Sequence, residues 1–226
     1  MRKTQITFTL ILFAIFLAYT CMCIMVDVSW FSPINAYSGE ATYGQAEVGF
    51  YSININVRNA IDFNETFYKL SEYLGYLALL TGAAIGCLWL YRLVKTRNLM
   101  AVEPILNASV VTLALMVAFY VLFEAVDLNY RPVVLKDGLE PSYPSSHTLL
   151  GLVVFGCAAM VCKSLTRDKG LGKSLCFMFW LLGTLVMLFR ALSGVHWLSD
   201  IVGGMLLSAA LLYLNLYLAE AQEKLK

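Results

Sequence analysis

Five residues in the second half of the chain have side chains that could act together on an anion. Arg190, His196 and Asp200 follow one another closely between two long apolar runs. His147, the other of only two histidines, stands at the start of another apolar run, and Arg131 precedes it. Arginine forks match the oxygens of a phosphate, and a histidine beside an aspartate can act as a base or nucleophile. The pattern indicates chemistry on an anion, with phosphate as the first candidate.

The pair His196 and Asp200 is spaced like neighbours on a helix. Residues four apart lie on the same helical face, so the carboxylate is expected to bond one ring nitrogen and leave the other as nucleophile or base. Asp200 is expected a full turn inside an apolar helix, and an ionisable residue at membrane depth is a functional candidate by default. His147 comes from a different apolar run, so it can approach a bound group from the other side as general acid.

Around these residues the sequence offers a cradle for the anion. Arg131 and Arg190 supply forked donors, and Ser145 and Ser146 occupy the place of N-cap residues, where free backbone N–H groups favour an anion. Taken singly, each has an ordinary explanation, because a histidine at a helix start often caps it and an arginine near a span end often snorkels. Their joint placement favours a functional site.

The composition bounds the class of protein. Hydrophobic residues make up 60% of the chain and charged residues only 14%, against about 25% charged in soluble domains. The sequence therefore predicts a multi-pass membrane protein in a single domain, residues 1–226. The net charge of +1 gives no reason to expect a nucleic-acid partner, and no spacing of histidine and cysteine predicts a metal or a cofactor.

Six apolar runs approach the ~20 residues that cross a bilayer. The predicted fold is an all-α bundle of six transmembrane helices, with an extracytoplasmic loop region between helices one and two. The expected spans are residues 6–26, 74–93, 105–123, 147–162, 175–192 and 196–218.

The long first loop, residues 27–67, is polar and rich in aromatic residues, as suits a segment at the headgroup level. Ile53, Ile55 and Val57 alternate with polar residues, which indicates a short strand, although a helix beginning near Val57 is the alternative.

Basic residues give the orientation. Most lysines and arginines near the span ends fall at the N-terminus, after spans two and four, and at the C-terminus. These places share one side of a six-span chain, which the positive-inside rule assigns to the cytoplasm. Every suspected reactive residue then lies on the extracytoplasmic face of the cell membrane.

These residues also carry a resemblance. The chain resembles the type 2 phosphatidic acid phosphatase superfamily of integral-membrane lipid phosphatases, whose signatures are Lys-x6-Arg-Pro, Pro-Ser-Gly-His and Ser-Arg-x5-His-x3-Asp. Three stretches match, all between residues 124 and 200: Arg131-Pro132, Pro144-Ser145-Ser146-His147 and Arg190-x5-His196-x3-Asp200.

The resemblance implies a role for each matching residue. His196 would attack phosphorus to form a phosphohistidine, Asp200 would orient it, and His147 would protonate the leaving group and later help to activate water. The phosphate would be held by Arg131, Arg190 and Ser145, with Ser146 in the glycine position and no metal or cofactor.

Two positions depart from the family pattern. Glu124 stands where the family has lysine, and because a carboxylate repels phosphate we expect it to turn away, toward Arg131. Lys136 is the candidate stand-in for the missing lysine. Phe189 replaces the serine before Arg190, which removes one hydroxyl from the cradle.

The function implied is hydrolysis of a lipid phosphate or diphosphate at the extracytoplasmic face of the membrane, with membrane lipids as partners. Undecaprenyl diphosphate, phosphatidate, diacylglycerol diphosphate and phosphatidylglycerophosphate are all candidates. The alternatives are a lipid-linked phosphotransferase that uses the same histidine, and a non-catalytic lipid-binding protein. No feature of the sequence indicates an oligomeric state.

Overall fold

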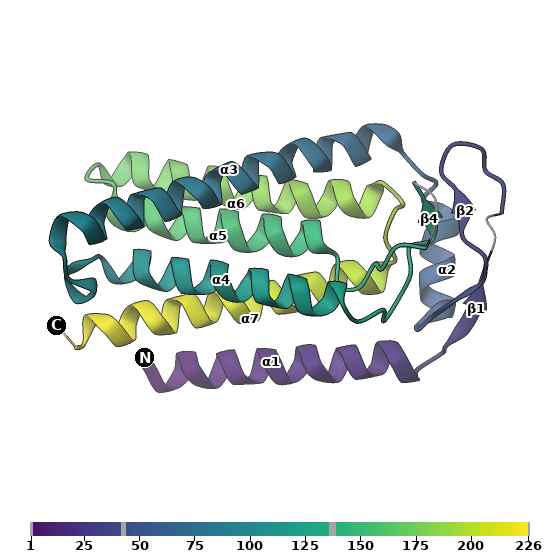
Figure 1. Cartoon of the computed structure of the whole chain (residues 1–226), viewed down its shortest axis with the longest axis horizontal. Helices are drawn as coiled ribbons and strands as arrows, with labels where there is room; N and C mark the ends of the chain where they lie inside the picture. Colours follow the sequence, from purple (N-terminus) through teal and green to yellow (C-terminus); the bar gives the residue numbers. More distant parts are fainter. Residues whose placement is uncertain (1, 42–43, 136–138, 226) are drawn as a thin grey trace.

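Six long helices run side by side, with loops, short strands and a short helix over one end (Figure 1). The computed structural model describes residues 2–41, 44–135 and 139–225. All six long helices are long and apolar enough to cross a membrane, so the predicted all-α six-span fold is confirmed. They are α1 (Arg2–Met25), α3 (Glu65–Thr96), α4 (Pro104–Glu124), α5 (Ser146–Leu165), α6 (Lys169–Leu192) and α7 (Leu198–Glu223).

Two of these helices form the centre of the bundle. In α5, 61% of the most apolar stretch is buried within the protein, and in α7 50%, against 11–33% in the other four. α5 packs against α3, α4, α6 and α7, while α1 packs against α7. The residues predicted to be catalytic stand at or just before the first turns of α5 and α7, so the most enclosed helices position them.

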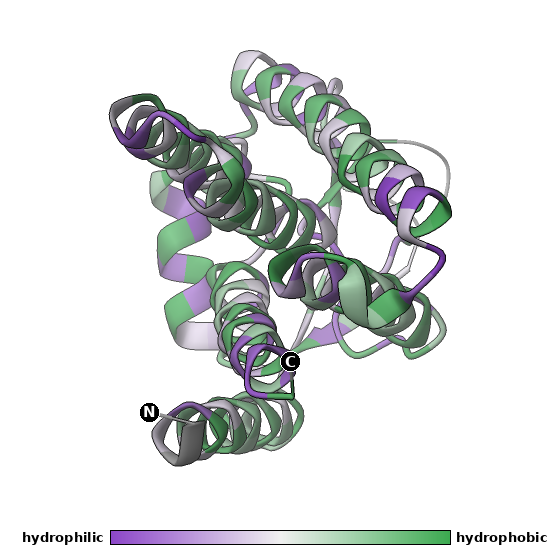
Figure 2. Ribbon diagram, turned by 90° about the vertical axis from the view of Figure 1, so that its left-hand side faces the viewer, coloured by the Kyte–Doolittle hydropathy of each residue, from purple (hydrophilic) through white to green (hydrophobic). Residues whose placement is uncertain are grey.

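The long helices consist largely of hydrophobic residues (Figure 2), and many of their large apolar side chains are exposed. Leu80, Val94 and Phe177, on two different helices, are each at least 65% exposed. Apolar patches of this extent are rare on soluble monomers, whereas lipid tails cover them in a bilayer. The surface therefore agrees with a multi-pass membrane protein.

The segment after α1 folds over the end of the bundle. Strand β1 (Ser29–Phe31) pairs antiparallel with β3 (Ala46–Val48), and β2 (Ile34–Asn35) pairs in parallel with β4 (Val133–Val134). The β2–β4 pair joins the first loop to the loop that holds Arg131.

The strand expected over residues 52–57 is wrong, because Tyr51–Ala60 form a short helix, α2. The alternating residues do not share a buried face: Ile53 is 56% exposed. The buried contact comes instead from the polar Asn54, whose side chain donates to the Gly49 carbonyl, 2.8 Å away.

Four helices begin two or more residues away from the predicted start. α3 begins at Glu65 and not Leu74, α6 at Lys169 and not Leu175, α7 at Leu198 and not His196, and α1 at Arg2 and not Ile6. The first two gain polar opening turns that side chains cap: Asn64 accepts from the Phe67 N–H and Asp168 from the Gly170 N–H. Hydropathy does not detect such caps, and the first loop, predicted to end at residue 67, ends before Glu65.

Candidate active site

A tight turn between α6 and α7 presents His196. Gly194 in this turn has φ 71°, and a Cβ there would lie 2.9 Å from the carbonyl oxygen of Asp62. Only glycine combines that backbone conformation with so close an approach. The expectation that His196 and Asp200 share a helical face is corrected: His196 precedes α7, and Asp200 lies in its first turn.

The two side chains nevertheless meet. His196 Nδ1 is 3.4 Å from Asp200 Oδ2. The Trp197 N–H donates to the same oxygen at 3.1 Å, and Asn129 Nδ2 donates to Oδ1 at 3.1 Å. Asp200 is completely buried, so these donors and the positive end of the α7 dipole stabilise its charge.

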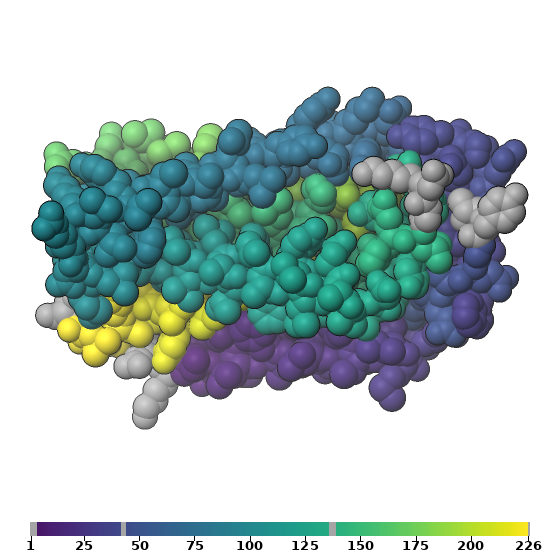
Figure 3. All heavy atoms as spheres, in the orientation of Figure 1, coloured from purple at the N-terminus to yellow at the C-terminus, as the bar shows by residue number. Residues whose placement is uncertain are grey.

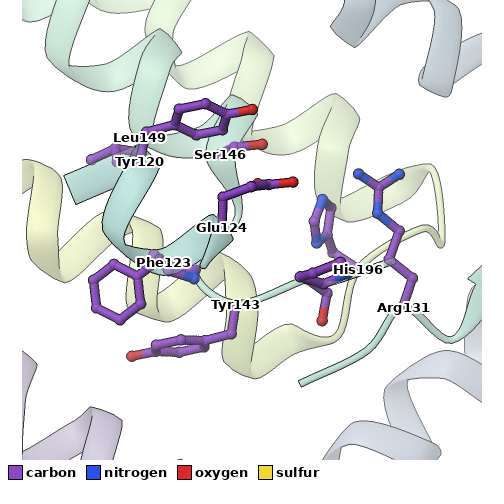
Figure 4. A pocket seen from close by; sticks show the side chains of 11 residues that line it. Tyr120, Phe123, Glu124, Arg131, Tyr143, Ser146, Leu149 and His196 are labelled. Atoms are coloured by element: carbon purple, nitrogen blue, oxygen red, sulfur yellow. The ribbon is translucent and has the colours of Figure 1, made fainter. Parts of the chain in front are cut away.

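The other ring nitrogen of His196 faces a cavity. Across the described part of the chain, Nε2 is buried and has no hydrogen-bond partner. The cavity is lined by Arg131, Tyr143, Ser146 and His196, among others (Figure 4). Burial lowers the pKa of the His196 imidazole well below its usual value, and the positive charges of Arg131 and Arg190 lower it further. A neutral imidazole with a free nitrogen is the form that can attack phosphorus.

His147 lies in the first turn of α5 and contacts α3. Its Nε2 is 3.0 Å from Glu72 Oε1, while Nδ1 is buried and without a partner among the described residues. Tyr120, Ser146 and Leu149 line both the cavity beside His196 and the one that His147 lines. The two histidines therefore line adjoining cavities at one end of the bundle.

Both predicted arginines are present here, each with a carboxylate partner. Arg131 Nη1 is 3.0 Å from Glu140 Oε2 across its loop. Arg190 is almost completely buried and its Nη1 donates to Glu72 Oε1 at 2.8 Å and to Ser71 Oγ at 3.1 Å. The Nε atoms of both arginines are buried and unbonded in the described ranges, so both guanidinium groups keep donor capacity.

The start of α5 completes the cradle. Ser145 is the N-cap, as predicted, and its Oγ accepts from the Thr148 N–H at 3.4 Å and from its hydroxyl at 3.0 Å. Ser146 is the first helical residue and lines both cavities. Lys136, the proposed stand-in for the family lysine, lies outside the described residues.

Glu124 does not pair with Arg131 as expected, because Glu140 takes that place. The Glu124 side chain instead lines the cavity with Arg131 and His196 (Figure 4). A carboxylate therefore lines the same cavity as Arg131 and His196, at the position where the family carries a lysine. Phe189, the other departure, turns away and stacks on Phe67 with ring centroids 5.6 Å apart.

Close packing holds the two central helices at the site. Gly203 of α7 faces the ring of Tyr143, so that a Cβ there would lie 2.5 Å from Cε2. The Tyr143 hydroxyl is 2.7 Å from Thr20 Oγ1 of α1. Gly204 lies against the backbone of Ser145. The glycine pair thus permits the contact between α7 and the segment that leads into α5.

A larger cavity of about 460 Å³ runs from His147 between α3, α4 and α5. Figure 3 shows the surface hollowed between α3 and α4, with α5 visible beneath. Apart from Glu72, Ser146 and His147, it is lined by apolar residues, tyrosines and a glycine: Gly75, Tyr76, Leu79, Met116, Val117, Tyr120, Leu149 and Leu150.

Sequence reasoning missed two side chains that hold this site, Glu72 and Asn129. Glu72 falls just before the predicted start of the second span, in the polar opening of α3. The available signal was the repeat of Tyr68, Ser71, Glu72 and Gly75, which places polar and small residues on one helical face. Asn129 belongs to a loop and carried no periodic signal.

Comparison with solved structures identifies the fold. Among solved structures, the fold matches a crystal structure described as the first transmembrane PAP2-type phosphatidylglycerolphosphate phosphatase from Bacillus subtilis. The match covers 96% of this chain and 97% of that one, with a TM-score of 0.59 and 18% identity. This protein therefore has the fold of a PAP2-type membrane phosphatase.

The sequence of the same region matches a family model. The PAP2 superfamily matches residues 124–224, which contain all three motifs, and this match confirms the resemblance that the motifs indicate. No curated protein sequence matches the chain.

Proposed function

We propose that the protein is a membrane phosphatase that hydrolyses a lipid phosphate or diphosphate through a phosphohistidine. The observation that carries the proposal is the placement of His196, held by Asp200, and of His147 beside adjoining cavities at one end of the bundle. Nε2 of His196 attacks phosphorus, and His147 protonates the leaving oxygen. Water, with His147 as base, then releases phosphate from the phosphohistidine.

The charge that develops on phosphorus is balanced by protein donors. Arg131 and Arg190 hold phosphate oxygens, together with the start of α5, where Ser145 and Ser146 stand. Preorganised donors of this kind stabilise a transition state without a metal ion, so we expect a metal-independent reaction that needs no cofactor. Lys136 remains the candidate for an additional cation; if it is one, Lys136→Ala raises KM or lowers kcat.

The cavity between α3, α4 and α5 supports a lipid as the substrate. It begins at His147, it is lined mostly by apolar residues, and it opens on the lipid-facing surface. An acyl or prenyl chain would lie there while its phosphate meets the histidines. Undecaprenyl diphosphate, phosphatidate, diacylglycerol diphosphate and phosphatidylglycerophosphate all have this form, and the B. subtilis protein of similar fold is described as a phosphatase of the last.

Charge supports an extracytoplasmic site. The C-terminal ends of α3, α5 and α7 lie together at one end of the bundle, and the starts of α5 and α7 lie at the other (Figure 1). The first end carries Arg92, Lys95, Lys163 and Lys224, and the second carries the histidines. By the positive-inside rule the basic end faces the cytoplasm.

The test is phosphate release from a panel of these lipids by detergent-purified protein, with EDTA present. We expect release by the wild type and a loss of at least about 100-fold in His147→Ala and His196→Ala, the scale of acid–base catalysis. Release only after an acceptor is added would identify a phosphotransferase. Activity that disappears in EDTA would contradict the metal-independent route, and unchanged function in His196→Ala would favour a lipid-binding protein.

A further inference from the structure

The opening turns of α3 contribute one whole helical face to the site. Tyr68, Ser71, Glu72 and Gly75 have the spacing of residues on the same face. The Arg190 guanidinium lies over the Tyr68 ring, 5.1 Å from its centroid, and donates to Ser71 and Glu72. All four residues lie outside residues 124–224, the region that matches the superfamily.

Glu72 is the centre of this face. Its Oε1 atom lies 3.0 Å from His147 Nε2 and 2.8 Å from Arg190 Nη1. The carboxylate is only 24% exposed. In such a place hydrogen bonds to an ionised group are short and strong, so Glu72 fixes the position of His147. Arg190 is held independently as well, by Ser71 and by the Tyr68 ring.

The pair formed by Glu72 and His147 parallels the pair formed by Asp200 and His196. In each, a carboxylate meets one ring nitrogen, and the other nitrogen is buried without a partner in the described parts of the chain. Gly75 fixes the orientation of the His147 ring further, because a Cβ there would lie 3.0 Å from its Cδ2. The His147 ring is therefore confined between the Glu72 carboxylate and the backbone of Gly75.

We propose that Glu72 is the positioning residue of His147, an inference that rests on the proposed phosphatase function. Glu72 accepts from Nε2–H throughout the reaction. When the bond from His196 Nε2 to phosphorus forms and the bond from phosphorus to the lipid oxygen breaks, His147 Nδ1 gives its proton to that oxygen. In the second step Nδ1 takes a proton from the attacking water. The water oxygen bonds to phosphorus, the bond from phosphorus to His196 Nε2 breaks, and no proton passes to Glu72.

The test compares two small phosphate esters of similar size. Benzyl phosphate releases an alkoxide that needs a proton, whereas 4-nitrophenyl phosphate releases a phenolate that does not. We measure kcat/KM, which reports the step that forms the phosphohistidine. Glu72→Gln should lower kcat/KM for benzyl phosphate roughly 10- to 100-fold, part of the 10²–10⁴-fold that a general acid contributes. The value for 4-nitrophenyl phosphate should stay within about threefold, which also shows that the variant is folded.

Two further variants sharpen the result. Glu72→Asp keeps the charge but shortens the side chain, so it should show the same selective loss. Glu65→Gln removes an exposed carboxylate from the same helix, whose ion-pair partner is the exposed Lys69, and it should change kcat/KM for neither ester.

Equal losses on both esters in both Glu72 variants would overturn the proposal, because they would mark a structural or phosphate-holding role. Unchanged rates together with stronger inhibition by inorganic phosphate would also overturn it, by showing that Glu72 merely fills the empty anion site. If the wild type hydrolyses neither the esters nor any lipid phosphate, the proposed function itself fails.

Discussion

The side chain of Asn54 on α2 bonds the first turn of α7 twice, donating to Ser199 Oγ at 2.9 Å and accepting from the Ser199 N–H at 3.1 Å. Ser199 neighbours Asp200, so the segment after α1 directly braces the turn that carries the proposed nucleophile. Phe31 adds an edge contact to Trp197, with ring centroids 4.9 Å apart. The long first loop thus has a defined structural role at the site.

Asn54→Ala should destabilise the protein by about 1–3 kcal/mol, the cost of leaving a buried polar group such as the Ser199 N–H unsatisfied. We expect a lower melting temperature in detergent and a lower kcat, because the catalytic turn loses its brace. Asn56→Ala, on the exposed side of the same helix, serves as the control. An unchanged melting temperature in Asn54→Ala would contradict the bracing role.

Asp200→Asn should reduce kcat by about 10²–10⁴-fold while the protein remains folded, because an amide no longer selects the tautomer with a free Nε2. The accompanying measurement is the yield of acid-labile phosphoenzyme after a brief reaction, which should fall with the rate. Asp168→Asn makes the matched change at the other end of the bundle. There asparagine caps a helix as well as aspartate does, and activity should be retained; a similar loss in both variants would show that the effect at Asp200 is not local.

The pH profile should reflect the lowered pKa of His196. A ring whose pKa is lowered stays neutral, and therefore nucleophilic, at pH values where an ordinary histidine is already protonated. With 4-nitrophenyl phosphate, corrected for titration of the substrate, the acidic limb of kcat/KM should have its midpoint below about 6.5. By the same linkage the free energy of unfolding should decrease as the pH falls below that value. A midpoint at or above 6.5 would mean that the ring is not buried as described.

Leu79→Trp should narrow the cavity that leads from His147. We expect KM to rise with the length of the lipid chain, while 4-nitrophenyl phosphate, which has no chain, keeps its KM. Leu80→Trp introduces the same side chain at a position that is 69% exposed and does not line the cavity. It should change KM neither for the long-chain lipids nor for 4-nitrophenyl phosphate. If Leu79→Trp leaves long-chain substrates unaffected, the tail lies elsewhere.

Gly203→Ala should destabilise the bundle by about 1–3 kcal/mol, because the new methyl group must displace the Tyr143 ring. Gly86→Ala provides the contrast, since a Cβ there meets nothing within 4 Å and alanine is the better helix former. Melting temperatures in detergent should therefore move in opposite directions. A lower melting temperature in both variants would show that the contact with Tyr143 is not the reason for the glycine at position 203.

The sequence was sufficient for the spans and for the motif residues, because both are local signals. Apolar runs mark membrane helices, and His147, His196 and Asp200 stand at fixed spacings beside them. The pairing of Glu72 with His147 joins residues far apart in the chain, and so does the pairing of β2 with β4. No sequence periodicity predicts such contacts. Because the first turns of α3 are polar, hydropathy placed Glu72 before the second span and not within a helix. The expected pairing of Arg131 with Glu124 was also wrong, because Glu140, nine residues after Arg131, forms that ion pair.

The site has a further consequence for how this polypeptide can be divided. A fragment that starts at residue 124 retains every signature of the superfamily, yet it lacks Glu72, Asn54 and Phe31. The two histidines and Asp200 come from one half of the molecule, whereas Glu72, Asn54 and Phe31 come from the other. We therefore expect the second half to become active only when the amino-terminal half lies beside it in the same membrane with the correct orientation.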